Sequence, residues 1–570
     1  MQQAKGMSVS LLPGLRRLRA YQPSWLRGDV LAGVTVAAYL VPQCMAYGEL
    51  AGVAPIAGLW AILPAMLLYA LIGSSPQLSV GPESTTAVMT AAAIAPIAAG
   101  DPLAYASFAS LLAVLVGLVC VLGAWARLGF LADLLSKPIL VGYMAGVAVI
   151  MISGQIGKIS GLELEAKSLA GELLEVARRS TEIHLPTLLL ALGVLAFLLL
   201  IQRRFPTAPG PLLAVLLAVA AVALFQLDQA GVAVIGAIPA GLPSFVMPTT
   251  ALSGDLALDT FRYLLTAAAG IALVGYSDNV LTARAFAARG GYRIDANQEL
   301  LALGTVNLGT GLMQGFPVSS SASRTAISVS IGSRSQLFSL VACVVVLVVL
   351  LVLRPLLAMF PQAALGAIVI SAALRLIDIG ELKRMRHFKR SEFRLALITC
   401  AGVLFTDILM GVGLAVALSV IDLFARLVRP HAAVLGQVPR LGGLHDVDDW
   451  QGASTIPGLM LYRYDAPLCF ANAEDFRHRA LAAIAAEATP VRWFVLNAEA
   501  IVEIDITAAD VLQDFHRELT ATGVVFAMAR AKQELYQQLS RAGLVQRMGA
   551  ERFFPTLPEA IAAFRRETAG

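Results

Sequence analysis

The chain contains 570 residues, of which 58% are hydrophobic and 14% charged, and its net charge at pH 7 is only +4. Soluble domains are about 45–50% apolar and about 25% charged, so this composition excludes an ordinary soluble protein. The near-balance of charge, without a long basic tract, argues against a nucleic-acid partner. The five cysteines are scattered without metal-ligand spacing, and we therefore predict no metal site and no cofactor.

Residues 1–28 are predicted to form a cytoplasmic N-terminal segment. Arg16, Arg17, Arg19 and Arg27 precede the first apolar run, a pattern also found in signal peptides. The run continues past residues 41–43 without a convincing cleavage site, and further apolar segments follow. We therefore expect an uncleaved first span in the inner (plasma) membrane.

Apolar segments of about 20 residues, the length that crosses a hydrocarbon core of about 30 Å, recur between residues 29 and 430. They fall at about 30–48, 55–73, 104–126, 136–156, 185–202, 210–227, 261–285, 296–314, 336–353, 361–377, 392–407 and 408–427. Two interrupted segments, at about 82–99 and 321–333, bring the total to about fourteen. An even number of spans places both termini on the same side.

Loop charges support this topology, because cytoplasmic loops are enriched in Lys and Arg. The predicted outer loop at 228–260 contains Asp228, Asp255 and Asp259 but no Lys or Arg. Arg354 is the one misfit on the outer side, where its long side chain could reach the interface. The predicted inner loops contain Arg127, Lys137, Arg203, Arg204, Arg284, Arg289, Arg293, Lys383, Arg384, Arg386, Lys389 and Arg390. Both termini are therefore predicted to be cytoplasmic.

Two polar stretches rich in Gly, Pro and Ser, residues 77–86 and 315–325, interrupt the third and the tenth segments. A lipid-exposed loop is excluded at bilayer depth, because each unpaired backbone group there costs several kcal/mol. Broken helices at corresponding positions of two halves are typical of a substrate site between inverted repeats. The pattern predicts a transporter with 7+7 spans.

The region 431–570 has ordinary globular composition and alternates predicted strands with predicted helices. The strands are 459–464, 493–497 and 524–528, and the helices are 473–486, 507–519, 532–542 and 557–565. This alternation predicts a small α/β domain. No Gly-rich phosphate loop follows a strand, and the six histidines have no metal spacing, so an enzyme is not predicted.

The first span carries a recognisable motif, Gly-Val-Thr-Val-Ala-Ala-Tyr-Leu-Val-Pro-Gln-Cys-Met-Ala-Tyr at 33–47, followed by Ala-Gly-Val-Ala-Pro-Ile-Ala-Gly-Leu at 51–59. These residues resemble the signature of the sulfate permease (SulP) family, and the C-terminal region looks like a STAS domain. The resemblance implies a 7+7 membrane domain at 29–430, divided into core and gate, and a cytoplasmic STAS domain at 431–570. It further implies a homodimer that moves sulfate, bicarbonate, chloride, oxalate or dicarboxylates by an elevator-like shift.

The two breaks are the predicted anion site, because a helix N-terminus offers unpaired N–H groups and about half a positive charge. We expect helices to begin near Pro82, which suits a first helical turn, and near Ser321. Hydroxyl donors for the anion are provided by Ser84, Ser319, Ser320, Ser321 and Ser323. The alternative is that these serines only cap the helices.

Arg324 is the strongest single signal, since a guanidinium at bilayer depth is costly and marks an ion path. It sits where the SulP family places an arginine after its anion-binding half-helix. The alternative is a structural ion pair with Asp278 or Glu83. Gln43 also matches a family site position, with helix–helix hydrogen bonding as its alternative.

Asp278 and Thr282 lie one helical turn apart and share a face of the eighth span. They resemble the cation ligands of sodium-coupled family members, but Ala322 replaces a hydroxyl residue of that sodium site. Two helix ends and Arg324 together provide roughly +2, which matches divalent sulfate if Asp278 is protonated. We therefore predict proton–sulfate symport through Asp278, with Glu83 as the alternative proton carrier.

Residues 505–508, Asp-Ile-Thr-Ala, resemble the loop that carries the phosphorylated residue of anti-sigma antagonists, although the following glycine is absent. Thr507 is either a regulatory phosphosite or, as we favour, a plain helix N-cap. Three alternatives to the symporter remain open. They are a bicarbonate or dicarboxylate carrier (sodium-coupled or an anion exchanger), an uncoupled anion channel, and a regulatory scaffold built on the STAS domain.

Overall fold

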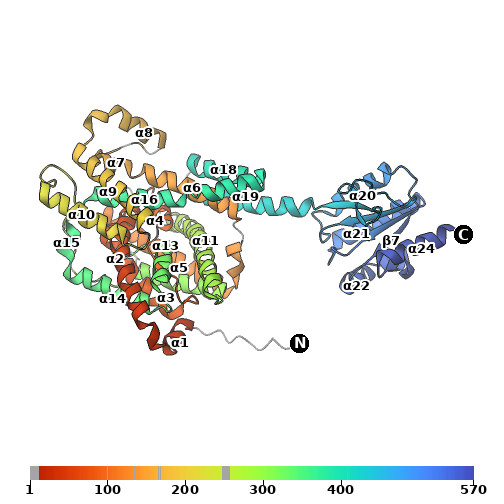
Figure 1. Cartoon of the computed structure of the whole chain (residues 1–570), viewed down its shortest axis with the longest axis horizontal. Helices are drawn as coiled ribbons and strands as arrows, with labels where there is room; N and C mark the ends of the chain where they lie inside the picture. Colours follow the sequence, from red (N-terminus) through yellow and green to blue (C-terminus); the bar gives the residue numbers. More distant parts are fainter. Residues whose placement is uncertain are drawn as a thin grey trace. The chain divides into compact units, whose positions relative to one another are not determined.

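The computed structural model describes residues 12–98, 101–133, 136–164, 166, 169–239, 241–246, 257–406 and 408–569. The chain divides into two compact units, Met1–Ser419 and Val420–Gly570 (Figure 1). Residues 1–11 of the predicted N-terminal segment and residues 240 and 247–256 of the predicted outer loop lie outside the described residues.

Each of the fourteen predicted spans coincides with a helix, which confirms the predicted helical membrane fold. In chain order these are α2 (Leu26–Leu50), α3 (Pro55–Ile72), α4 (Ser84–Ile94), α5 (Pro102–Trp125), α6 (Lys137–Ser153), α9 (Leu185–Arg204), α10 (Gly210–Phe225), α11 (Ala257–Gly290), α12 (Ala296–Leu312), α13 (Ala322–Ile331), α14 (Leu337–Val352), α16 (Gln362–Leu376), α18 (Arg390–Phe405) and α19 (Ile408–Val428). Among the described residues, seven helices of 18 residues or more are apolar enough to cross a membrane.

In the described part of the first unit, five further helices were not predicted, because they are too short to produce an apolar segment of spanning length. They are α1 (Pro13–Arg19), α7 (Ile156–Ser160), α8 (Leu169–Arg178), α15 (Arg354–Ala358) and α17 (Ile379–Phe388). α17 carries the basic residues of a predicted inner loop, including Arg384 and Arg386. α1 precedes the first span, and the other four follow or connect the predicted spans.

The spans pack as two bundles, which we call the core bundle and the gate bundle. The core bundle contains α2–α5 and α11–α14, and the gate bundle contains α6, α9, α10, α16, α18 and α19. In the core bundle, α5 and α12 approach each other closely where two glycines face each other. A Cβ on Gly117 would lie only 2.8 Å from the carbonyl oxygen of Gly304. Small residues of this kind permit close helix contact inside a membrane. The two bundles meet chiefly where α10 and α16 pack against α2.

The second unit is built on a six-stranded sheet of order β4-β3-β5-β6-β7-β8. β5 (Leu459–Tyr464), β6 (Trp493–Asn497), β7 (Val525–Ala529) and β8 (Phe553–Phe554) are parallel, whereas β3 (Ala432–Gly436) is antiparallel to β5 and to β4 (His445–Asp446). One face packs on α20 (Ala473–Ala486), α21 (Ile506–Ala521), α22 (Gln533–Arg541) and α23 (Leu544–Met548), and the other on α24 (Leu557–Ala569). The predicted α/β domain is therefore present.

Candidate functional site

The two helix breaks meet. Val80–Gly81 (β1) and Ser319–Ser320 (β2) form a two-residue antiparallel pair, with Val80 opposite Ser320 and Gly81 opposite Ser319. The backbone N–H of Ser321 donates to the carbonyl of Ser79 at 2.9 Å and lengthens the pair. Pairing satisfies backbone groups that would otherwise be unbonded within the membrane domain. Because the strands are antiparallel, α4 and α13 leave this point in opposite directions with both N-termini beside it.

The start of α4 differs from the prediction. The helix begins at Ser84 with Glu83 as its N-cap, so Pro82 precedes the helix instead of lying in its first turn. The Glu83 carboxylate accepts from the Thr85 N–H at 2.8 Å and from the Ser84 hydroxyl at 3.0 Å. A carboxylate at the N-cap accepts from an otherwise unpaired N–H group of the first turn, which proline cannot do. The helix therefore begins after Glu83 and not at Pro82. One donor of the α4 terminus is therefore already occupied by protein.

Arg324 lies in the first turn of α13 and is completely buried, at 0% exposure. Its Nη1 donates to the carbonyl oxygen of Pro82 at 2.8 Å and to Gln43 Oε1 at 3.4 Å, and its Nε donates to Ser79 Oγ at 3.4 Å. Its Nη2 is buried without a hydrogen-bond partner. Among the ion pairs of the described residues, none joins Arg324 to Asp278 or Glu83. The structural ion pair considered above is therefore wrong.

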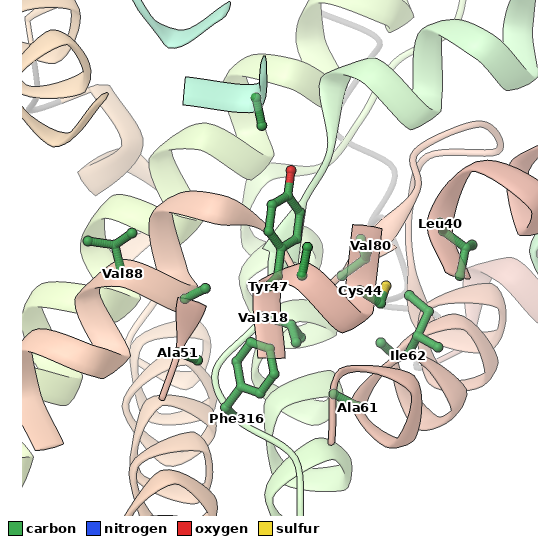
Figure 2. Close-up of a cluster of buried hydrophobic side chains, with 14 of the residues drawn as sticks. Leu40, Cys44, Tyr47, Ala51, Ala61, Ile62, Val80, Val88, Phe316 and Val318 are labelled. Atoms are coloured by element: carbon green, nitrogen blue, oxygen red, sulfur yellow. The ribbon is translucent and has the colours of Figure 1, made fainter. Parts of the chain in front are cut away.

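Apolar side chains surround the paired breaks, as Figure 2 shows for Val80, Val318, Phe316 and Ile62. A Cβ on Gly81 would lie 1.9 Å from Cδ1 of Ile62 and 3.5 Å from Nη2 of Arg324. A side chain at position 81 would therefore displace the end of the Ile62 side chain. Low-polarity surroundings strengthen the field of a buried guanidinium. Nη2 of Arg324, which has no hydrogen-bond partner, thus lies beside Gly81.

One face of α2 carries three polar tips, on Tyr39, Gln43 and Tyr47, spaced four residues apart. Gln43 donates through Nε2 to the Tyr47 hydroxyl at 3.0 Å, while its Oε1 accepts from Arg324. The Tyr39 hydroxyl accepts from Arg375 Nη1 of α16 at 2.9 Å. Figure 2 shows the Tyr47 ring among apolar side chains with its hydroxyl oxygen directed away from them. Gln43 therefore contacts Arg324, and the same stripe reaches the gate bundle.

The predicted serines include those that donate to a carboxylate, Ser84 and Ser320, and those that bond to each other, Ser321 and Ser323. Ser320 Oγ donates to Asp278 Oδ2 at 3.5 Å, and Ser84 Oγ donates to Glu83. Ser321 occupies the N-cap position of α13 but makes no side-chain cap, and its hydroxyl instead exchanges a 3.1 Å hydrogen bond with Ser323. Helix capping therefore does not explain Ser321 and Ser323. The first-turn N–H groups of α13 have no side-chain cap.

Asp278 and Thr282 lie one turn apart on α11, as predicted, and Asp278 is joined to the breaks through Ser320. Thr282 is buried. The residues that the structure describes contain no cluster of three or more His, Cys, Asp and Glu suited to a metal ion.

Sequence reasoning missed a buried carboxylate nearby, Glu299 of α12. It is 0% exposed and accepts from the Tyr69 hydroxyl, the Ser74 N–H and hydroxyl, the Ser75 N–H and Asn279 Nδ2, at 2.7 to 3.2 Å. An acidic residue inside an apolar segment is a general signal of function. Here the side chain joins α3, α11 and α12, and its partners could not be identified from spacing.

The predicted N-cap in the second unit is wrong. α21 begins at Ile506, and Asp505 is its N-cap, accepting from the Ala508 N–H at 2.8 Å and from the Phe470 N–H at 2.7 Å. Aspartate outcompetes threonine here because its two oxygens serve both donors. Thr507 is the second residue of the helix and is exposed.

Among the described residues, fourteen helices coincide with the predicted spans, and the strands that precede α4 and α13 pair beside a buried arginine, which is the architecture of a polytopic membrane transporter. The chain belongs to the sulfate permease family, whose model matches residues 26–399, and a STAS domain model matches residues 452–560. A probable sulfate transporter from Mycobacterium tuberculosis is 53% identical over 559 residues, 98% of this chain and 99% of that protein. Sulfate transporter 4.1, chloroplastic, from Arabidopsis thaliana is 28% identical over 97% of this chain and 82% of its own length.

Solved structures share the fold. The murine anion transporter Slc26a9, in a structure described as inward-facing, superposes with a TM-score of 0.88 and 20% identity, covering 99% of this chain and 96% of that one. The transmembrane domain of the cyanobacterial bicarbonate transporter BicA matches 70% of this chain and 98% of its own, with a TM-score of 0.60 and 24% identity. The predicted fold class is confirmed by these likenesses.

Proposed function

We propose that this protein takes up sulfate by proton-coupled symport. The observation that carries the proposal is Arg324, a fully buried guanidinium with one nitrogen unpartnered, placed where the N-termini of α4 and α13 meet. A charge buried without a counterion is costly, and an oxyanion bound at Nη2 would compensate it. The sulfate transporter names of the relatives from Mycobacterium and Arabidopsis support sulfate as the anion.

The first shell would consist of Arg324 Nη2, the N–H groups at the start of α13, and the hydroxyls of Ser321 and Ser323. Gln43 positions Arg324 by accepting from Nη1. Ser84 and Ser320 would join only after releasing the carboxylates to which they now donate. Sulfate suits such donors because its four oxygens accept in several directions.

The two carboxyls near the site set the coupling. Arg324 contributes +1 and the two helix ends about +0.5 each, giving roughly +2 before acidic residues are counted. Each ionised carboxylate, Asp278 or Glu83, subtracts one charge, so protonation raises the attraction for a divalent anion. Asp278 is the preferred proton carrier, because Glu83 already caps α4. Thr282, one turn from Asp278, would belong to a sodium site only if uptake followed a sodium gradient.

Radiolabelled sulfate uptake into vesicles under imposed proton and sodium gradients tests this function. The wild-type protein should concentrate sulfate when the outside is acidic, without a sodium requirement. Asp278→Asn should abolish the pH dependence, whereas Glu83→Gln, the matched neutral variant, should retain it. An unchanged pH profile in Asp278→Asn would exclude Asp278 as the carrier.

The same vesicles distinguish the alternatives. Uptake of bicarbonate or a dicarboxylate in preference to sulfate would indicate a different carrier, and trans-stimulation would indicate exchange. Currents without concentrative uptake would indicate a channel. No uptake of any of these anions by the wild-type protein would leave the scaffold role of the STAS domain, whereas uptake that is lost in Arg324→Ala would count against that role.

We also propose that the core bundle moves against the gate bundle in an elevator-like step. Polar contacts of α2 with the gate side include Tyr39 with Arg375 of α16 at 2.9 Å and Glu49 with Lys158 of α7, which follows α6, at 2.8 Å. Other contacts of α2 with α16 are largely apolar and can slide without losing hydrogen bonds. Cross-linking of cysteines placed on α2 and α16 should change with sulfate and pH.

Family membership and the loop charges support three further proposals. The protein lies in the inner membrane with residues 29–430 as the transport domain, residues 431–570 are cytoplasmic, and the protein is a homodimer. Thr507, exposed near the start of α21, remains a candidate phosphosite. Accessibility labelling of introduced cysteines, cross-linking of the purified protein and mass spectrometry of residue 507 test these points in turn.

A further inference from the structure

A cavity lies away from the proposed anion site, in the first unit between α1, the start of α2 and the segments that follow α3 and α13. Its volume is about 270 Å³. The residues that matter for its chemistry are Arg17, Leu18, Trp25, Ser75, Tyr292 and Arg334. Among the described residues that line it, the only charged side chains are Arg17 and Arg334, and both are positive. The cavity therefore attracts anions.

The polar wall of this cavity is rigidly built. Gln336 Nε2 donates to the carbonyls of Ser75 and Leu78 at 3.0 and 2.9 Å, and the Tyr292 hydroxyl lies 3.1 Å from Ser75 Oγ. Arg17 Nη1 donates to the carbonyl of Ser74. These bonds hold the segment between α3 and β1 against α14. The donors of the cavity are thus fixed before any ligand binds.

The acidic residues behind this wall do not neutralise the two arginines at the cavity surface. Asp29, 0% exposed, accepts from the N–H groups of Arg334 and Ser335 at 2.7 and 3.2 Å and from the Ser335 hydroxyl at 2.6 Å. Glu299 is saturated by its own donors, and neither carboxylate lines the cavity. No ion pair of the described residues involves the side chain of Arg17 or Arg334. The guanidinium groups are therefore available to an external anion.

An apolar track leads away from the cavity. Trp25 lines it and directly precedes α2, on which Leu26, Val30 and Val34 are 50%, 37% and 47% exposed. Their spacing of four residues places them in one stripe along the helix. Such a stripe on a membrane span faces lipid tails, and tryptophan favours the headgroup level. A ligand with an acidic head and an acyl tail would contact both features at once.

We propose that this cavity, between α1 and the start of α2, binds the phosphate headgroup of an anionic phospholipid. Arg17 and Arg334 hold the phosphate, the Ser75 and Tyr292 hydroxyls contact its polar substituent, and an acyl chain follows the Leu26 stripe. Basic pockets beside membrane helices recognise acidic headgroups in this way. Because Ser75 and Leu78 lead directly into β1, an occupied cavity would also brace the segment that carries one of the two helix breaks.

Quenching of Trp25 fluorescence by brominated lipids tests the proposal on the full-length protein in nanodiscs. The chain has five tryptophans, so the Trp25 contribution is the difference between the wild type and Trp25→Phe. Brominated phosphatidylglycerol should quench Trp25 at roughly 25-fold lower mole fraction than brominated phosphatidylcholine, because each of the two arginines contributes about 1 kcal/mol, or about 5-fold. Arg334→Gln should reduce this preference to roughly 5-fold, because Arg17 remains.

Arg19→Gln is the matched control, because Arg19 lies on α1 but does not line the cavity. It should retain the preference, and Arg17→Lys should retain most of it if α1 stays folded, which the melting temperature of each variant reports. Equal loss in Arg19→Gln and Arg334→Gln, or no preference in the wild type, would overturn the proposal. If millimolar glycerol phosphate abolishes quenching by brominated phosphatidylglycerol, and the lipid binds no more tightly than glycerol phosphate, the lipid is not the occupant. The site would then be assigned to a soluble phosphate.

Discussion

Two buried charges of the core bundle have opposite surroundings. Glu299 and Arg324 are both 0% exposed, yet Glu299 accepts from five different donor groups whereas Arg324 leaves Nη2 without a partner. A buried ion whose hydrogen-bonding capacity is filled by protein has nothing left for a substrate. A buried ion with unused capacity is destabilising unless a ligand completes it. The comparison distinguishes a structural charge from the charge that we propose to bind the substrate.

The two residues also differ in what holds them. Glu299 joins the end of α3 to α11 through Ser74, Ser75 and Asn279, all fixed parts of the core bundle. Arg324 is held by the carbonyl of Pro82 and the side chain of Gln43, both beside the helix breaks. Loss of Glu299 should therefore be observed as instability and loss of Arg324 as inactivity.

Arg324→Gln should have the largest effect, and it should fall on transport. A unit charge at 4 Å contributes about 4 kcal/mol at the effective dielectric of 20 typical of proteins, which corresponds to roughly 1000-fold in Kd. We expect no saturable sulfate uptake and little change in melting temperature. Arg324→Lys keeps the charge but not the forked donors that reach Pro82 and Gln43, so partial activity is expected. Uptake by Arg324→Gln at the wild-type KM would contradict the assignment.

Glu299→Gln should lower stability instead. The amide keeps the shape of the side chain, but its NH2 group must face one of the N–H or hydroxyl donors that the carboxylate accepts. An unsatisfied buried donor costs about 1–3 kcal/mol, and more when a charged partner is lost. The melting temperature and yield of the purified protein should fall, while the remaining folded protein should keep the wild-type KM. If Arg324→Gln unfolds and Glu299→Gln does not, the distinction between the two charges is wrong.

Tyr39→Phe sharpens the comparison on a smaller scale. It removes one hydrogen bond between α2 and Arg375 of the gate bundle, worth about 1 kcal/mol or roughly 5-fold in a rate. If the bundles move, the maximal uptake rate should change by up to that factor while KM stays constant. Tyr47→Phe is the matched control, because its hydroxyl bonds to Gln43 within α2. A change in KM only for Tyr39→Phe, with no change in rate, would contradict a role in the movement.

Apolar length was sufficient to predict twelve of the fourteen helices, the other two being interrupted segments, and β5, β6 and α20 coincide with their predicted ranges. Span length and buried apolar strands are local properties, which explains this success. β3 and β8 were missed because β3 is rich in alanine and β8 contains only two residues, so their pairing depends on neighbours distant in sequence. Local pattern cannot reveal such pairing.

The same reasoning applies to the site. Gly, Pro and Ser in two apolar segments predicted the breaks, but the pairing of Val80 with Ser320 joins residues 240 positions apart. The starts of α4 and α21 were placed wrongly because Glu83 and Asp505 outcompete Pro82 and Thr507 as caps. The partners of Glu299 belong to α3 and α11 and could only be identified in three dimensions.

The smallest effect is expected in the second unit, at His516 of α21. Burial, reinforced by the positive charge of Arg547, lowers the pKa of His516 below its usual value near 6.5. The unfolded state therefore binds more protons as the pH falls below about 6.5, so the stability of this unit is complete above that pH and decreases on acidification. Hydrogen exchange of α21, corrected for intrinsic rates, should show weaker protection at pH 5.5 than at pH 7.5. His516→Gln should reduce that difference in protection between the two pH values. His478→Gln, a change at an exposed histidine of α20, is the control and should leave the difference intact. Equal effects of the two substitutions would show that His516 is not the titrating group.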